Sequence, residues 1–526
     1  MLQPWHKANP GTPLPATSAS ATPEGVTPLR LAFLAVFLIS ACGLGYQLVA
    51  GSVSSYLLGD SVTQFSITIG LYLSALGLGS FLSKYLDSDL VDRFVAIELA
   101  VALAGGFSAL AIQAAHTSDI WFRPALYGNI MVVGTLVGIE IPLLIRILEE
   151  RLELKELLAR VLAWDYVGAL AVALAFPLVL LPHIGLARSA LALGVVNAAV
   201  GLWTIQLFHT RVKRPARLRI EAGIVLVILA VGYSQAARLT RVIEHQAYAG
   251  DVVLAETSPY QRLVVTRTGP DFQLFLSGAL QFNSADEYRY HEALVHPAVA
   301  TALEAQRALV LGGGDGLALR ELLRHDGIRE ITLVDLDAAV TGLARNYPAL
   351  VELNGDSLND PRVTVVHADA MGWLTESGER FDVIIVDFPD PHSFSVGKLY
   401  TKTFYERLLR RLAPDGAIAV QSTSPRLAPR SYWCIVRTME AAGFFVRPYR
   451  CSVPSFGEWG FTLAAPREFP IPDQVPAGCR FLTPEFLKTL FILPQDVLPP
   501  AGASEAEVNR LNTQVLVRLY GTEVAR

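Results

Sequence analysis

Seven long stretches without any acidic or basic side chain constrain this chain more than any other feature. They cover residues 31–59, 61–83, 99–118, 124–139, 166–187, 189–210 and 222–237. Most are close to the roughly 20 residues that a helix needs to cross a bilayer. Helices of a soluble core would show polar faces at helical spacing, whereas these stretches are apolar on every side. We therefore predict a multi-span α-helical membrane domain over residues 30–237, about seven helices in all, in a multi-pass protein of the cell (inner) membrane with the lipid bilayer as a partner.

The basic residues between these stretches fall mainly on one side of the predicted membrane. That side holds Lys84, Arg93, Arg146, Arg151, Lys155, Arg160, Arg211, Lys213, Arg214, Arg217 and Arg219. The other side has mainly Arg123 and Arg188. Under the positive-inside rule the larger group faces the cytoplasm. Seven crossings then put everything beyond Arg238 outside.

Two acids lie at or near the ends of apolar stretches. Glu140 follows the fourth stretch, and Asp165 precedes the fifth. Charge at such positions is costly and usually faces protein or water, so one interpretation is a path for cations. The other, which we favour, is that both carboxylates lie at the membrane interface and pair with Arg146 or Arg160.

Outside the apolar half, the composition is that of a soluble protein. Asp, Glu, Lys and Arg make up 27 of residues 30–237 but 62 of residues 238–526. Residues 1–29 are rich in proline and small polar residues, which predicts a disordered tail. The net charge of −5 gives no basic footprint for nucleic acid. The four cysteines form no C-x-x-C pair, so we expect neither a metal site nor a disulfide framework.

The second half carries an α/β pattern. Short strand-like runs between turns predict a small β unit over residues 238–283. Beyond it, residues 308–311 read as a buried strand, 312–316 as a glycine turn, 317–324 as a helix and 331–334 as the next strand. Further strands are expected at 363–366, 383–386 and 417–420. The pattern predicts a Rossmann-like, methyltransferase-type domain with a doubly wound parallel sheet over residues 284–465, followed by a C-terminal extension, residues 466–526, in which we find no chemistry.

Acids after these strands point to a nucleoside. Asp335 ends the strand after the glycine turn, where a carboxylate accepts hydrogen bonds from ribose hydroxyls. Asp369 and Ala370 follow the next strand, placed to meet an adenine amino group. The turn lacks the spacing that binds a pyrophosphate, so adenosine without phosphates fits better than a dinucleotide. Taken singly, each acid could instead cap a helix.

The residues of this half, in order, resemble the aminopropyltransferases (spermidine synthases), in the branch with a fused multi-span membrane domain. The matching stretches are Tyr260-Gln261, Gly278-Ala-Leu-Gln281, Asp286-Glu287, Tyr290-His291-Glu292, Gly312-Gly-Gly-Asp-Gly316, Asp387-Phe388-Pro389-Asp390-Pro391, Leu399-Tyr400, Phe404-Tyr405 and Gly457-Glu-Trp-Gly-Phe461. The resemblance implies transfer of an aminopropyl group from decarboxylated S-adenosylmethionine, a co-substrate, to putrescine. The products are spermidine and methylthioadenosine, and no cofactor is needed.

The resemblance also assigns roles to residues. An alkylammonium has no lone pair, so the attacking amine needs a base, and Asp387 takes that role. Asp390 supplies a second negative charge for the diamine. Asp315 would repel the carboxylate of intact S-adenosylmethionine and attract the bare aminopropyl ammonium; its alternative role is to cap the next helix. Other residues expected at the acceptor are His291, Tyr290, Phe388 and Pro389. Those expected at the donor nucleoside are Gln261, Gly312, Gly314, Asp335, Asp369 and Ala370.

Departures from the family pattern bear on the acceptor. Ser277-Gly278 stands where Asp-Gly is usual, Asp335 replaces the usual Glu, Phe394 replaces a Pro, and Phe456 stands near the place of an acceptor-site Tyr. None removes the base, but spermidine, agmatine or cadaverine remain alternatives to putrescine.

Two other functions stay open at this point. One is a methyltransferase that uses intact S-adenosylmethionine, against which Asp315 argues. The other is a non-catalytic polyamine transporter or sensor. As partners we expect the diamine, the donor and the bilayer, with a homo-oligomer as an option and no nucleic acid. Donor and diamine are cytoplasmic substrates, so the outward placement of residues 238–526 conflicts with them unless one stretch does not cross, the charge rule misleads, or product is delivered outward.

Overall fold

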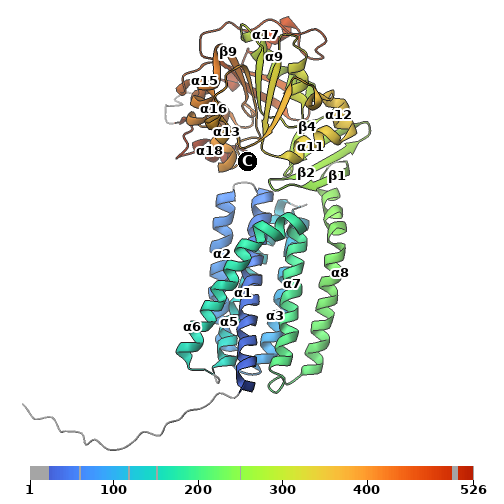
Figure 1. Cartoon of the computed structure of the whole chain (residues 1–526), viewed down its shortest axis with the longest axis vertical. Coiled ribbons are helices and arrows are strands. Elements are labelled where there is room, and N and C mark those ends of the chain that lie inside the picture. Colours follow the sequence, from blue (N-terminus) through green and yellow to red (C-terminus); the bar gives the residue numbers. More distant parts are fainter. Residues whose placement is uncertain are drawn as a thin grey trace, which may run out of the picture.

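The computed structural model describes residues 23–58, 61–116, 119–149, 152–248, 250–499 and 507–524. Most of the predicted tail lies outside these residues, but from Pro23 the chain is already in helix α1. The described chain forms a helical bundle and an α/β domain, one above the other in Figure 1. The α/β domain sits at the end of the bundle away from the start of α1.

Eight α-helices make up the described part of the bundle. Apolar side chains offer the backbone no hydrogen-bond partners, and a helix pairs the backbone N–H and C=O groups within its own segment. They are α1 (Pro23–Leu58), α2 (Ser61–Leu82), α3 (Leu90–Gly106), α4 (Ser108–Ala115), α5 (Asp119–Leu148), α6 (Leu154–Ala175), α7 (Leu181–Leu207) and α8 (Pro215–Ala247). A short 3-10 turn, Ser83–Tyr85, follows α2, and a π-helical turn, Phe176–Leu180, joins α6 to α7.

Five helical segments among the described residues have the length and composition to cross a membrane, and the bent pair α3 and α4 makes a sixth. The longest segment, Leu154–Leu207, is interrupted at Gly185, whose φ of 76° and ψ of 173° are not helical. Gly185 lies five residues into α7, and the rest of α7 runs apart from α6 (Figure 1). The apolar stretches thus lie mainly in the described helices, but residues 166–187 span the end of α6, the π-helical turn and the start of α7.

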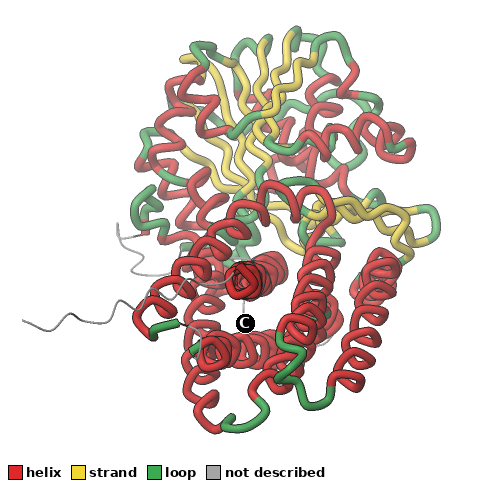
Figure 2. The backbone as a smooth tube through the Cα atoms, turned by 60° about the horizontal axis from the view of Figure 1, so that its bottom comes forward, coloured by secondary structure: helices red, strands yellow, loops and turns green. Residues whose placement is uncertain are grey.

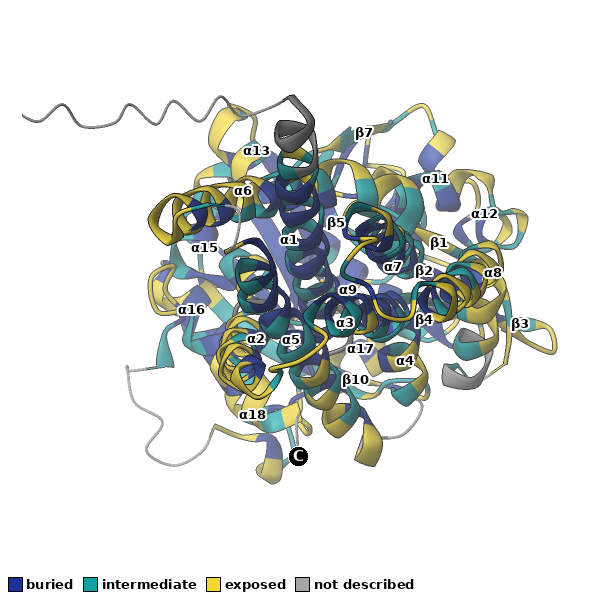
Figure 3. Ribbon diagram, turned by 90° about the horizontal axis from the view of Figure 1, so that it is seen from below, coloured by how far each residue is buried: buried dark blue, intermediate teal, exposed yellow. Residues whose placement is uncertain are grey.

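Glycines let the bundle helices approach closely. A Cβ atom at Gly168 of α6 would collide with the carbonyl oxygen of Phe37 in α1, and one at Gly138 of α5 would collide with that of Leu76 in α2. Small residues at such contacts are typical of helix packing where hydrophobic burial cannot drive association. Figure 3 shows α1 lined with buried residues, while α2, α6 and α8 carry exposed ones.

The small β unit is an antiparallel sheet in the order β1-β2-β3-β4. Its strands are β1 (Asp251–Thr257), β2 (Arg262–Thr268), β3 (Asp271–Leu276) and β4 (Ala279–Asn283). Ser277 and Gly278, with φ of 49° and 83°, form the tight turn between β3 and β4. Helix α8 continues to Ala247, so the unit begins later than the predicted boundary at residue 238.

The main sheet has seven strands in the order β10-β11-β9-β8-β5-β6-β7. They are β5 (Arg307–Gly312), β6 (Glu330–Asp335), β7 (Val363–His367), β8 (Phe381–Asp387), β9 (Leu412–Gln421), β10 (Phe445–Val453) and β11 (Gly457–Ala465). Strands β5 to β9 are parallel, but β11 runs antiparallel to both β9 and β10. The prediction of a wholly parallel sheet is wrong at this edge, because a three-residue turn between β10 and β11 allows only an antiparallel pair.

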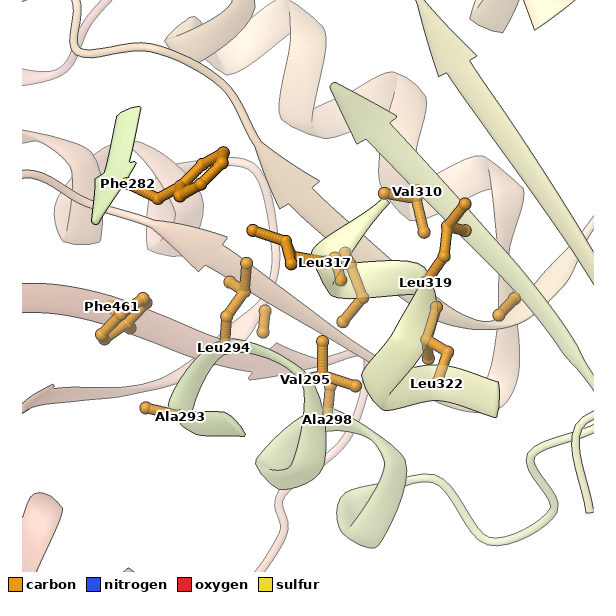
Figure 4. Close-up of a cluster of buried hydrophobic side chains, with 14 of the residues drawn as sticks. Phe282, Ala293, Leu294, Val295, Ala298, Val310, Leu317, Leu319, Leu322 and Phe461 are labelled. Atoms are coloured by element: carbon orange, nitrogen blue, oxygen red, sulfur yellow. The ribbon is translucent and has the colours of Figure 1, made fainter. Parts of the chain in front are cut away.

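Helices cover both faces of this sheet, whose strands fan out side by side between them in Figure 2. They are α9 (Glu287–Thr301), α10 (Leu317–Leu323), α11 (Ala338–Asn346), α12 (Pro348–Asn354), α13 (Ala370–Glu376), α14 (Phe394–Gly397), α15 (Lys402–Arg411), α16 (Pro429–Ala441), α17 (Pro484–Leu490) and α18 (Val515–Val524). Alternate strand residues enter separate cores: Val310 and Ile385 pack on one side, Leu311 and Val386 on the other. In Figure 4, Leu294 and Val295 of α9 face α10 within the first core.

Candidate active site

The site lies where the parallel strands end. Gly312, the last residue of β5, pairs with Asp387, the last residue of β8, and Asp335 ends the neighbouring β6. Parallel strands present their carboxyl ends at one edge, where open α/β sheets bind ligands. The expected meeting of the glycine turn with these two acids is therefore present in the structure.

The glycine turn is shaped by close approaches to both acids. Gly312 and Gly313 have φ of 77° and 66°, in the left-handed region. A Cβ atom at Gly312 would collide with the backbone oxygen of Asp387, and one at Gly314 would lie 2.6 Å from the Asp335 carboxylate. The backbone N–H of Gly314 donates to Asp335 Oδ2 at 3.0 Å. Any side chain here would push the two acids out of place.

A cleft of about 560 Å³ lies beside Asp335, lined by Glu256, Thr257, Ser258, Pro259, Tyr260, Leu336, Asp337, Ala338, Ala339, His367, Ala368 and Asp369. It is large enough for a nucleoside. Burial raises the pKa of Asp335, while the backbone N–H groups of Asp337 and Gly314 lower it in part. Of the residues predicted at the donor nucleoside, Asp369 lines the cleft, and Asp335 directly precedes the lining residue Leu336.

Gln261 reaches this region through an acid that we did not predict. Its side-chain amide donates to Asp337 Oδ2 at 2.9 Å, and the Ser258 hydroxyl donates to the same oxygen at 2.7 Å. Asp337 also caps α11 by accepting from the Ala339 N–H. Its signal in the sequence was its place two residues after Asp335 at the strand end.

Asp369 has partners other than the expected adenine. It caps α13 by accepting from the Gly372 N–H at 3.0 Å, and Lys398 Nζ lies 2.5 Å from its other oxygen. Burial opposes ionisation, but the ion pair and the cap lower the pKa of Asp369 below its usual value. The capping alternative therefore holds for Asp369, and Ala370 is buried behind it as the first residue of α13.

Asp387 is buried and faces the predicted acceptor residues. The Tyr290 hydroxyl donates to Asp387 Oδ1 at 2.6 Å. Burial raises the pKa of Asp387, and the charge of His291 and the Tyr290 hydrogen bond oppose that rise. A buried carboxylate with one oxygen free of Tyr290 is suited to accept a proton from an amine.

His291 is held by an acid one helical turn earlier. Its Nδ1 lies 2.8 Å from Glu287 Oε2, and Arg320 Nη1 donates to Glu287 Oε1 at 2.8 Å. Burial disfavours the charged imidazole, but the hydrogen bond and charge of Glu287 outweigh it and raise the pKa of His291 to about 9. Glu287 and Arg320 are thus positioning residues. The sequence offered Glu287 only within a family stretch, and it gave no signal for Arg320.

Asp315 makes the contact expected of its capping role, and its selection of the donor stays a prediction. Its Oδ1 accepts from the Leu317 N–H at 2.9 Å, which caps the start of α10. Burial raises the pKa of Asp315 to about 6, with the charge of His291 lowering it and that of Asp387 raising it. The carboxyl therefore belongs to the same electrostatic cluster as Asp387 and His291.

Asp390 has three donors, and none of them was predicted. They are Tyr520 Oη at 2.7 Å and Thr423 Oγ1 at 3.3 Å, both to Oδ2, and Gln421 Nε2 at 3.2 Å to Oδ1. Burial raises the pKa of Asp390, and these bonds counter the rise. Gln421 ends β9 as Asp387 ends β8, and Thr423 lies two residues further on, so the strand-end rule could have found them. Tyr520, in α18, gave no signal in the sequence.

Aromatic side chains enclose the acceptor region. Tyr290 lies 6.3 Å from Phe456 and 6.4 Å from Trp459, measured between ring centroids. Phe388 packs on Tyr400, whose hydroxyl donates to the Pro389 carbonyl at 3.1 Å. Aromatic faces attract alkylammonium groups and cover methylene chains. Tyr290, Phe456 and Trp459 therefore form an aromatic wall beside Asp387, whereas Phe388 packs in the core on the other face of the sheet.

The pairing predicted for the two acids of the helical half is wrong for Glu140. Glu140 is buried with no hydrogen-bond partner in the described chain. Arg146 instead donates to the carbonyls of Ser83 and Leu86, and Arg160 pairs with Glu156. Glu140 is therefore not an interface residue.

Within the described ranges, no group of three or more His, Cys, Asp and Glu side chains could hold a metal ion.

Comparisons with known proteins agree with this geometry. The Spermine/spermidine synthase domain family matches residues 287–469. A polyamine aminopropyltransferase of Leptospira interrogans is 45% identical over 93% of this chain and 98% of its own length. Polyamine aminopropyltransferase 1 of Ralstonia nicotianae is 47% identical over 96% of this chain and 98% of its own.

One solved structure that matches is a spermidine synthase in complex with the transition-state analogue AdoDATO. It is 27% identical, with a TM-score of 0.44, over 46% of this chain and 85% of that chain. The two polyamine aminopropyltransferases, at 45% and 47% identity, align along nearly their whole length. This chain therefore belongs to the polyamine aminopropyltransferase (spermidine synthase) family and is an aminopropyltransferase.

Proposed function

We propose that the enzyme transfers the aminopropyl group of decarboxylated S-adenosylmethionine to putrescine, as a membrane-anchored spermidine synthase. The amine nitrogen attacks the carbon next to the sulfonium, the new N–C bond forms as the C–S bond breaks, and the sulfur leaves with its electron pair as methylthioadenosine. The proton released by the nitrogen goes to Asp387. The other ammonium of the diamine lies toward Asp390.

A single observation carries this proposal: the Tyr290–Asp387 contact next to the glycine turn. The base lies at the same strand edge as the turn, since Gly312 pairs with Asp387. A donor in the cleft beside Asp335 would extend its aminopropyl chain past that turn toward Asp387. Much of the rate would come from aligning nitrogen, carbon and sulfur, as in other two-substrate reactions.

The acceptor test is turnover of the purified full chain with decarboxylated S-adenosylmethionine and four amines in turn: putrescine, cadaverine, agmatine and spermidine. We expect putrescine to give the highest kcat/KM. A higher value with another amine would overturn the choice of acceptor and leave the aminopropyl transfer intact. Methyl transfer from intact S-adenosylmethionine at a comparable rate would instead favour the methyltransferase alternative.

We also propose that the bundle crosses the cell membrane. Support comes from its outer face, where large apolar side chains are exposed on α2, α6 and α8, among them Leu73, Leu170 and Val227. Water would oppose such a surface, whereas lipid tails accept it. The anchoring test is membrane fractionation: the full chain should resist extraction by high salt and require detergent.

The charges of the loops give the bundle an orientation. The loops that join α2 to α3, α5 to α6 and α7 to α8 lie at the end where α1 begins, away from the sheet (Figure 1). Described basic residues near these loops include Lys84, Arg146, Lys155, Arg211 and Lys213. By the positive-inside rule we expect this end to be cytoplasmic and the α/β domain to lie on the outer side. Because donor and diamine are cytoplasmic substrates, this orientation requires that they reach the outer side and that product is delivered there. An alkaline phosphatase fused to the C-terminus should then be active; an inactive fusion, with a fluorescent cytoplasmic reporter active in its place, would contradict this orientation.

A further inference from the structure

The core of the bundle holds two acids that nothing in the described chain neutralises. Glu98 of α3 is 0% exposed and Glu140 of α5 is 1% exposed. None of their four carboxyl oxygens has a hydrogen-bond partner. An unpaired charge in such a place costs several kcal/mol, so the acids must hold protons or attract a cation.

The two acids belong to one cluster. Helix α3 packs against α5, and each carboxyl interacts electrostatically with the other and with Cys42 and Tyr46 of α1. Cys42 lies near the middle of the apolar segment Leu29–Ser55. The cluster therefore lies deep inside the bundle, far from the interfacial loops.

Two neutral polar groups complete the cluster. Asn197 of α7 is 1% exposed, and among the described residues neither its amide nitrogen nor its amide oxygen has a hydrogen-bond partner. It lies one turn before Gly201, where an added Cβ would be 3.5 Å from the Cβ of Glu98, so Asn197 lies on the face of α7 that meets α3. The Tyr46 hydroxyl is buried and unpartnered as well. Four helices thus direct unused polar groups to one region.

The donor set favours an ammonium over a metal ion. No described group of His, Cys, Asp and Glu is placed to hold a metal. An alkylammonium needs three acceptors for its three N–H donors, and the carboxyl oxygens, the Asn197 amide oxygen and the Tyr46 hydroxyl provide more than three. The established activity of the family acts on molecules with such groups.

We propose that Glu98, Glu140, Asn197 and Tyr46 form a second amine site, inside the bundle and separate from the catalytic site, that binds the ammonium groups of a polyamine. The inference depends neither on the identity of the acceptor nor on the orientation of the membrane domain. It gives the bundle a role in holding or passing polyamine in addition to anchoring.

The test counts radiolabelled spermidine bound to the full chain in lipid nanodiscs by equilibrium dialysis. The wild type should bind two molecules per chain, and E98Q/E140Q should bind one. Turnover of the double variant should stay within about twofold of wild type, because the two acids lie outside the catalytic site. A twofold change in rate corresponds to about 0.4 kcal/mol. The matched control is E221Q, which removes an exposed acid of α8 that pairs with Arg217.

Each single variant, E98Q and E140Q, should weaken the second site at least tenfold, which keeps the test valid if the double variant folds poorly. Binding of one spermidine by the wild type would show that the acids hold only protons and would overturn the proposal. Retention of both sites by E98Q/E140Q would overturn it as well.

Discussion

Replacement of Asp387 by Asn separates the proton-accepting role of this side chain from its structural one. The amide has nearly the same shape, and its oxygen can still accept from Tyr290, which donates to Asp387 Oδ1 at 2.6 Å. Burial raises the pKa of Asp387, so the charged side chain is a cost to the folded protein above that pKa. The neutral amide removes that cost, and the melting temperature should not fall.

The rate, by contrast, should fall steeply. General-base help is worth roughly 10²–10⁴-fold. At about 1.36 kcal/mol for each tenfold, this loss equals roughly 2.7–5.4 kcal/mol of transition-state stabilisation. Alignment of the two substrates by the glycine turn and the aromatic wall remains, so a residual rate should persist. The loss should appear in kcat, with little change in KM for the donor.

The assay is release of methylthioadenosine by the purified full chain, measured by chromatography across pH. The wild type should lose activity as pH falls through the raised pKa of Asp387, and D387N should lack this acidic limb. The control D473N changes an exposed acid that pairs with Lys488 and should leave both rate and profile unchanged. Turnover by D387N within tenfold of wild type would refute the assignment of the base.

Three further predictions follow from other contacts. Glu287→Gln should destabilise the protein most below about pH 6.5, because the raised pKa of His291 gives stability that is lost when the imidazole loses its proton. The difference in melting temperature between variant and wild type should therefore narrow as pH rises through about 9. Melting temperatures at about pH 6 and 10 test this, and an equal difference at both would contradict it. Tyr520→Phe removes one hydrogen-bond donor to Asp390. Hydrogen bonds to charged groups are worth about 1.5–3 kcal/mol, so KM for the diamine should rise about tenfold with kcat little changed. An unchanged KM would exclude α18 from acceptor binding. Gly168→Leu should lower the melting temperature in detergent because its side chain would collide with the α1 backbone, whereas Gly223→Leu, with no atom within 4 Å of its built Cβ, should not; equal effects would contradict the close packing of α1 and α6.

Patterns along the chain were enough to predict the layout of the molecule. Long stretches without charge indicate helices, because a helix makes the hydrogen bonds of its own backbone within the segment. The seven stretches can therefore be counted in the sequence before any packing is known. The strand that ends in Asp387 and the glycine turn after residue 311 are also local features, and parallel strands bring their carboxyl ends together by rule. These patterns therefore predicted that Asp387 and the glycine turn with Asp315 lie together, whereas Tyr290 and His291 were expected there only from the family resemblance.

Tertiary structure decided what depends on residues far apart in the sequence. The antiparallel pairing of β11 with β9, the contact of Tyr520 with Asp390 and the meeting of Glu98 with Glu140 each join segments whose own patterns give no sign of a partner. Local sequence fixes which atoms a side chain carries and on which element it lies. Which atoms it meets is set by how the elements pack, because the free energy of burying a charge or a hydroxyl depends on neighbours contributed by other parts of the chain.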